Sequence, residues 1–167
     1  PAKWINSGDL VVGNLGEGIL ALRTNSQLTV TGGDIVIAQQ AGGTGKLIIG
    51  TELGESQAGQ LTAPRIRFGS GDGALVFNHE STDYVFATTI QGKGVIAHQQ
   101  GSTIYTGNGS AFTGTTTVSG GMLRVNGTLG GTVDVQSGGT LGGIGFLGGA
   151  VTVATSGTLL GSSGQKI

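Results

Sequence analysis

The sequence has no cysteine, only 2 prolines and few charged residues among its 167. Without cysteine, no disulfide can form. Lys and Arg number 8 and Asp and Glu number 9, which leaves a formal net charge of −1. A balance so close to neutral excludes the basic surface that nucleic acids and anionic membranes attract. We therefore expect no nucleic-acid partner.

Long apolar runs are absent as well. No stretch approaches the roughly 20 consecutive apolar residues that a membrane-spanning helix needs. The first residues, Pro1–Trp4, show neither the apolar core nor the small-residue cleavage site of a signal peptide. Since the chain also lacks an initiator methionine, we expect it to be a fragment of a longer protein.

Glycine is the residue in excess, at 36 of 167, about three times its usual share of roughly 7%. Disordered chains combine low hydrophobicity with high net charge. Here 37% of the residues are hydrophobic and the charges nearly cancel. The chain is therefore expected to be ordered, with glycine separating short apolar clusters.

The apolar clusters are short alternating runs rather than helical repeats. Apolar residues do not recur at the i, i+3, i+4, i+7 spacing of a helix over any window of a dozen residues. The runs are rich in Val, Ile, Leu and Thr, which favour strands. Turn-forming pairs such as Gly-Gly and Asn-Gly separate them. The sequence predicts an all-β fold. Representative runs are Leu10–Val12, Ile35–Ile37, Leu47–Ile49, Ala74–Phe77 and Val151–Val153.

Internal repetition distinguishes between all-β architectures. The segment 133–141 recurs as 151–159, and the segment 7–12 recurs as 32–37. Units this short cannot bury a core alone, but stacked copies share a continuous one. An antiparallel sandwich, the rival architecture, needs longer strands and hairpins about every 8 to 12 residues. The repeats therefore predict a right-handed parallel β-helix, a solenoid of roughly eight turns.

Alternate aliphatic side chains along these runs are expected to point into the solenoid. Glycine and asparagine would form the corners, because a branched residue at positive φ would clash. The expected inward residues are Leu10, Val12, Leu28, Val30, Ile35, Ile37, Leu47, Ile49, Leu75, Phe77, Val133, Val135, Val151, Val153 and Leu159.

The second half of the chain resembles a known family. The segments that carry the resemblance are Leu75–Asn78, Tyr84–Phe86, Ile90–Gly94, Gly107–Asn108, Phe112–Val118, Gly120–Gly127 and Gly139–Gly145. In this order, and over about residues 74–164, they resemble the passenger-associated transport repeat of bacterial autotransporters. This sequence departs from the family at Phe112, where tyrosine is usual, and at Thr115, where glycine is common. The motif positions are Phe112, Thr113, Gly114, Val118, Gly121, Leu123, Gly127, Leu141, Gly142 and Gly145.

The resemblance implies a β-helical stem that is secreted by the type V route and displayed on a Gram-negative surface. It implies stem turns over residues 1–105, continuous with transport-repeat turns over residues 106–167. In this family the second region often acts as an autochaperone, which folds first and templates the rest. The implied partners are the protein's own outer-membrane β-barrel and its N-terminal passenger, within an adhesin or another virulence factor. The lack of cysteine fits passage through an oxidising periplasm.

Catalytic patterns are weak. A β-helical polysaccharide-degrading enzyme would need clustered carboxylates. Asp9 and Asp34 occupy equivalent places before strands and could stack, although turn chemistry explains them equally. One copy of a glycine-rich Asp motif at residues 69–75 indicates a turn rather than a calcium site. We expect no catalytic residues, no metal and no cofactor.

A binding surface for a host protein, a carbohydrate or a second copy of the chain is the alternative function. Residues 61–105 contain both histidines and both tyrosines and could form an exposed patch. The polar segment 78–84 is better explained as a solvated loop between two strands. The residues of this candidate patch are His79, Glu80, Asp83, Tyr84 and Tyr105.

Overall fold

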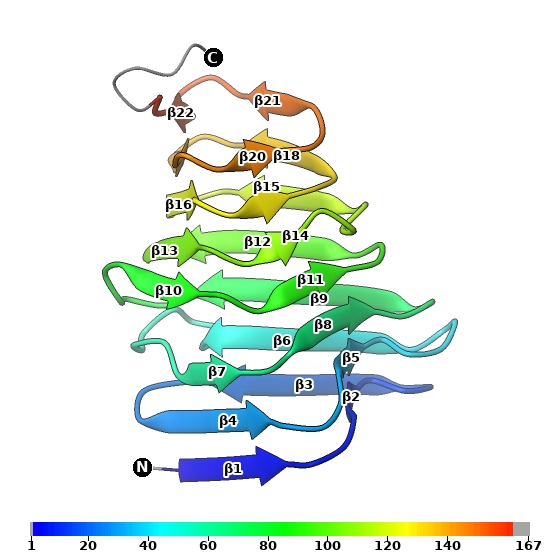
Figure 1. The fold of residues 1–167 in the computed structure, drawn as a ribbon. Coiled ribbons are helices and arrows are strands. Elements are labelled where there is room, and N and C mark those ends of the chain that lie inside the picture. Colours follow the sequence, from blue (N-terminus) through cyan, green and yellow to red (C-terminus); the bar gives the residue numbers. More distant parts are fainter. Residues whose placement is uncertain (1, 162–167) are drawn as a thin grey trace.

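The computed structural model describes residues 2–161. Every regular element in that range is a strand, 22 in all, and Figure 1 shows the strands stacked as a column of coils. Each complete coil supplies one strand to each of three faces. Seven coils are complete and one further strand follows, where the sequence predicts roughly eight turns. The all-β prediction is confirmed, and the described residues include no helix that could cross a membrane.

The first face consists of two sheets, the second of which starts at Tyr84. The strands of the first sheet are β1 (Ala2–Asn6), β4 (Ser26–Val30) and β7 (Gln60–Thr62). Those of the second sheet are β10 (Tyr84–Phe86), β13 (Ser102–Tyr105), β16 (Gly121–Val125), β19 (Gly139–Gly142) and β22 (Thr158–Leu159).

The second face is also divided into two sheets, and the third face is a single sheet of seven strands. The second face holds β2 (Leu10–Val12), β5 (Ile35–Ile37), β8 (Arg65–Phe68) and β11 (Thr89–Gln91), then β14 (Asn108–Gly109), β17 (Thr128–Leu129) and β20 (Phe146–Leu147). The third face holds β3 (Glu17–Leu22), β6 (Thr44–Gly50), β9 (Asp72–Asn78), β12 (Val95–Gln100), β15 (Thr115–Val118), β18 (Thr132–Val135) and β21 (Val151–Val153).

Paired strands are parallel on every face, as stacking requires. The two sequence repeats coincide with the register of neighbouring coils: Val133 lies opposite Val151, and Leu10 lies opposite Ile35. In Figure 1 the near strands run to the right and the far strands return to the left as the chain climbs, which makes the coil right-handed. The third-face sheet passes without interruption from β12 to β15, so both halves of the chain share it.

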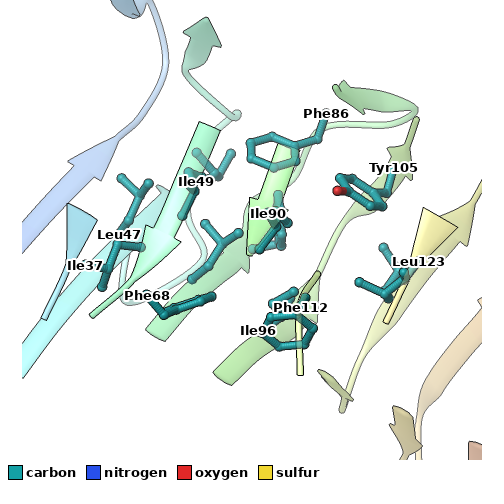
Figure 2. Close-up of a cluster of buried hydrophobic side chains, with 14 of the residues drawn as sticks. Ile37, Leu47, Ile49, Phe68, Phe86, Ile90, Ile96, Tyr105, Phe112 and Leu123 are labelled. Atoms are coloured by element: carbon teal, nitrogen blue, oxygen red, sulfur yellow. The ribbon is translucent and has the colours of Figure 1, made fainter. Parts of the chain in front are cut away.

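The core is a set of inward columns running along the axis (Figure 2). Leu47, Leu75 and Ile96 form one column through β6, β9 and β12, and all are buried. Two residues that are expected to be buried inside the solenoid are exposed: Val153 is 40% exposed and Leu159 is 37% exposed. Their register continues the inward columns, but no further coil covers them within the described residues.

Candidate functional site

Four of the five glycines among the motif positions, all except Gly142, lie where the backbones of successive coils approach closely. A Cβ added at Gly114 would lie 1.9 Å from the carbonyl oxygen of Gly94 in the coil below. At Gly145 it would lie 2.1 Å from the carbonyl oxygen of Gly127. Gly121 adds a φ of +63°, which side chains rarely tolerate. At these positions glycine permits backbone-to-backbone stacking.

The apolar motif positions fill the core. Phe112 is fully buried, and its ring centroid lies 5.8 Å from that of Phe68 in a tilted arrangement. Val118, Leu123 and Leu141 are also buried. The two remaining motif positions have other settings: Thr113 is exposed and Gly142 is half-buried.

The prediction of an exposed patch is wrong for three of its five residues. His79, Tyr84 and Tyr105 are buried, whereas Glu80 and Asp83 are exposed. The reason is strand alternation, which turns the side chains of Tyr84 and Tyr105 inward while their neighbours face solvent. Their hydroxyls remain paired: the Tyr84 hydroxyl donates to the Gly59 carbonyl oxygen at 3.0 Å. Burial raises the pKa of Tyr84 to about 12 and also raises the pKa of Tyr105.

Sequence reasoning missed a buried polar cluster around Thr103. The Oγ1 atom of Thr103 lies 3.1 Å from the Nε2 atom of His79 and 3.1 Å from the Nε2 atom of His98. The His98 Nδ1 atom lies 3.0 Å from the carbonyl oxygen of Gly120. Most of these partners are far apart in the chain, so only the stacking of coils brings them together.

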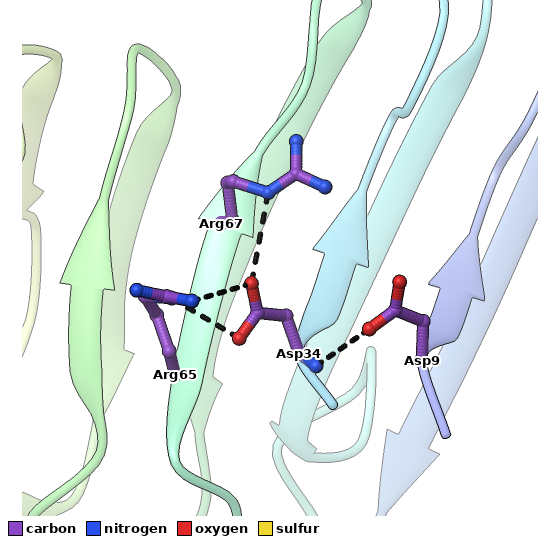
Figure 3. A network of polar contacts seen from close by, with 4 residues as sticks. All are labelled: Asp9, Asp34, Arg65 and Arg67. Carbon is purple, nitrogen blue, oxygen red and sulfur yellow. Dashed lines mark hydrogen bonds and ion pairs between the residues drawn. The ribbon is translucent and has the colours of Figure 1, made fainter. Parts of the chain in front are cut away.

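The two equivalent aspartates do stack, as the sequence suggests (Figure 3). The Asp34 backbone N–H donates to Asp9 Oδ1 at 2.8 Å. Arg65 on β8 donates two hydrogen bonds of 3.1 and 3.0 Å to the Asp34 carboxylate. The Arg67 Nε atom lies 3.8 Å from Asp34 Oδ2. These contacts among Asp9, Asp34, Arg65 and Arg67, called the ladder below, join three successive coils on the second face.

Replacing Asp34 by asparagine tests how much the ladder contributes. We expect the free energy of unfolding to fall by about 0.2–1 kcal/mol, because the Arg65 and Arg67 side chains are 44% and 39% exposed and solvent screens their charges. Urea unfolding at low and at high salt measures the effect, and high salt should shrink it. Asp9→Asn serves as the matched control, since Asp9 accepts only the backbone bond described above. A salt-independent loss above about 2 kcal/mol would contradict a surface role.

A long loop, residues 51–59, leaves the coil between β6 and β7. Asn78 at the end of β9 is buried, and its Nδ2 atom donates to the carbonyl oxygens of Thr51 and Glu52, both at 2.9 Å. Leu53 is 81% exposed. The buried asparagine thus anchors a loop that presents an apolar side chain to solvent.

A groove of about 900 Å³ crosses the third face where β6, β9, β12 and β15 begin. It is lined by glycines and hydroxyl side chains, with Lys46 and Lys93 among its residues. Lys46 pairs with Glu52 at 3.1 Å. Within residues 2–161, no three His, Asp or Glu side chains gather in a way that could hold a metal ion.

Comparison with known proteins relates this chain to cell-envelope proteins. The chain is 36% identical over 73 residues, 43% of its length, to the adhesin BmaC autotransporter of Brucella suis biovar 1 (strain 1330). It is 33% identical over 126 residues, 70% of its length, to the uncharacterized lipoprotein YdeK of Escherichia coli (strain K12). The matched parts amount to 2% and 9% of those proteins, so the chain spans a small part of each. No protein-family model and no solved structure matches the chain.

Both similarities agree with a surface or envelope location. An autotransporter adhesin and a lipoprotein are proteins of the cell envelope by their names. The parallel stacked strands are consistent with a passenger region of an autotransporter, which is the relation that the motif series implies. The chain is therefore related to bacterial envelope proteins at this coarse level.

Proposed function

We propose that the chain is a structural and folding module, the stem and autochaperone region of an autotransporter passenger from an adhesin or another virulence factor. The observation that carries the proposal is the coil-to-coil contact at Gly114 and Gly145, where the backbone of one coil fits directly on the next. Each coil thus gives its neighbour a surface on which to form. The similarity to an autotransporter adhesin supports the same function.

The stacking also suggests how the module assists export. A solenoid coil is stable only against a formed neighbour, so folding spreads from a nucleus. If the passenger leaves the outer-membrane barrel with its C-terminal end first, the coils of residues 106–160 form before the rest. They then offer strand edges with unpaired backbone N–H and C=O groups to the coils that follow. Folding outside the cell opposes backward sliding and would favour translocation. The partners are the barrel and the N-terminal passenger of the same protein.

We also propose that the segment is not itself an enzyme. The supporting observation is that three of its carboxylates form ion pairs with cationic side chains. The pairs are Asp34 with Arg65, Glu52 with Lys46 and Asp83 with Arg124. A general acid or base needs a carboxylate that is free to exchange a proton with substrate. These three are committed to ion pairs on separate parts of the surface.

Deleting single coils from the full-length protein tests the folding role. Removal of residues 133–150 excises one repeat and joins equivalent positions, because Val133 and Val151 are in register. We expect the amount of surface-displayed, protease-resistant passenger to fall severalfold. Removal of residues 7–31, which also joins equivalent positions, is the matched control and should have a smaller effect because it lies far from the nucleus. Equal effects of the two deletions would contradict an autochaperone.

A direct binding surface is the second candidate function. It is favoured by the exposure of Leu53 on the anchored loop and of Val85 on β10, since exposed apolar groups mark interaction sites. The ligand would be a host protein, a carbohydrate or another copy of the chain. An adhesion assay on full-length protein carrying Leu53→Ser and Val85→Ser separates the two functions, because both side chains are exposed and their replacement should leave folding and display unchanged. Normal display with lost adhesion would favour binding.

A further inference from the structure

The buried cluster around Thr103 has a defined direction of hydrogen bonding. The carbonyl oxygen of Gly120 can only accept, so the His98 Nδ1 atom at 3.0 Å must carry a proton. In a neutral ring the other nitrogen, Nε2, is then an acceptor. The Thr103 hydroxyl, 3.1 Å away, therefore donates to His98.

The Thr103 hydroxyl also determines which nitrogen of the His79 ring carries the proton. Having donated its only proton, Thr103 Oγ1 must accept from the His79 Nε2 atom at 3.1 Å. His79 is thus protonated on Nε2 and unprotonated on Nδ1, which is the opposite tautomer to that of His98. In agreement, His79 Nδ1 is a buried atom with no hydrogen-bond partner. Four groups form one chain, from His79 through Thr103 and His98 to Gly120.

The chain of bonds connects successive coils. His79 follows β9, His98 lies in β12, Thr103 lies in β13, and Gly120 precedes β16. It replaces apolar contacts in the core, since His98 occupies the inward column between Phe77 and Val118. Neither histidine side chain reaches solvent.

We propose that His79, Thr103 and His98 form an acid-sensitive latch, which holds these coils together while both rings are neutral and weakens them when the rings gain protons. The first proton enters at His79 Nδ1, a buried atom with no hydrogen-bond partner in the neutral state, and only the Ser81 backbone opposes the cost of burying its charge. A second proton, at His98 Nε2, forces the Thr103 hydroxyl to turn away and leaves its hydrogen unpaired. Both charges would then lie in the core, on rings whose centroids are 6.4 Å apart.

The surroundings of His79 offer no compensating negative charge. The titratable groups that face it are His98 from β12 and Tyr84 from β10, whose ring centroid is 5.4 Å from that of His79. None of the ion pairs among the described residues includes either histidine. Burial first, and then the charge of His98, lower the pKa of His79 to about 4, against the opposing effect of the Ser81 backbone. Burial also lowers the pKa of His98.

The direction of the pH effect follows from these pKa values. In the unfolded chain His79 titrates near 6.5, and in the folded chain near 4. Between these values the unfolded chain binds more protons, so stability falls as the pH falls through this window and levels off below about 4. For His79 alone the full change corresponds to about 300-fold in the folding equilibrium constant.

Nuclear magnetic resonance of the unchanged chain, with nitrogen-15 in its histidines, tests the latch directly. We expect opposite tautomers at neutral pH, with His98 protonated on Nδ1 and His79 on Nε2. The His79 ring should resist protonation until well below pH 6, and burial should lower the pKa of His98 below its ordinary value. Identical tautomers, or titration of both rings near pH 6.5 in the folded chain, would overturn the proposal.

Urea unfolding at pH 7 and pH 5 tests the effect on stability, in a range above the ordinary titration of carboxylates. The original chain should lose about tenfold or more in its folding equilibrium constant between these values. His79→Phe should remove most of that loss, because phenylalanine cannot titrate and can pack beside Tyr84. Thr103→Val should fold less stably at pH 7 and is the control for loss of the hydrogen bonds. An unaltered pH dependence in His79→Phe would refute the latch.

Discussion

Replacing Gly114 by alanine is expected to lower the free energy of unfolding by about 3 kcal/mol or more. The new Cβ would lie 1.9 Å from the Gly94 carbonyl oxygen and 2.7 Å from its backbone nitrogen. Both atoms belong to the backbone of the adjacent coil, so neither can move aside as a flexible side chain could. The coils must separate and lose strand pairing. Urea unfolding followed by circular dichroism measures the loss.

Gly16→Ala is the control for the change of residue type. A Cβ at Gly16 would meet no atom within 4 Å, so the free energy of unfolding should change by no more than about 0.5 kcal/mol. If both substitutions have similar effects, the cost comes from losing glycine itself and not from contact between coils.

The second large effect is expected for Phe112→Ala, with a loss of about 3–5 kcal/mol in the free energy of unfolding. Phe112 is fully buried and packs on Phe68. The substitution removes a ring from a position where coils above and below keep the surroundings fixed, so the cavity cannot close easily. Thermal and urea unfolding should both report the loss.

Phe146→Ala provides the matched comparison. Phe146 lies in β20 on the second face and is 65% exposed. Its removal should alter the free energy of unfolding by about 0.5 kcal/mol or less. A loss close to that of Phe112→Ala would mean that burial in the core is not what makes Phe112 important.

The sequence predicts the stacking well because repeats of equal length carry their own register. Val133 and Val151 occupy equivalent places in two copies of one repeat, and the structure pairs them. Alternation of aliphatic residues likewise identifies the inward positions of Leu47 and Leu75. These features depend on neighbours within a strand or on exact repetition, and both are visible in a single sequence.

Contacts between coils of unequal length could not be predicted from the sequence. Ile35 pairs with Leu10 in the preceding coil and with Ile66 in the following one, and the second partner is the more distant along the chain. Because corner loops vary in length, the approach of Arg65 to Asp34 cannot be read from spacing. The burial of His79 was hidden for the same reason: its segment is mostly polar, and its partner Thr103 comes from another coil.

The unequal continuity of the three faces has a mechanical consequence. The third face carries one uninterrupted set of hydrogen bonds from β3 to β21, whereas the first face breaks between β7 and β10 and the second between β11 and β14. A pulling force along the axis is therefore carried mainly by the continuous hydrogen bonds of the third face. Bending should concentrate at the two interruptions, so the rod would yield near its middle before its coils peel apart.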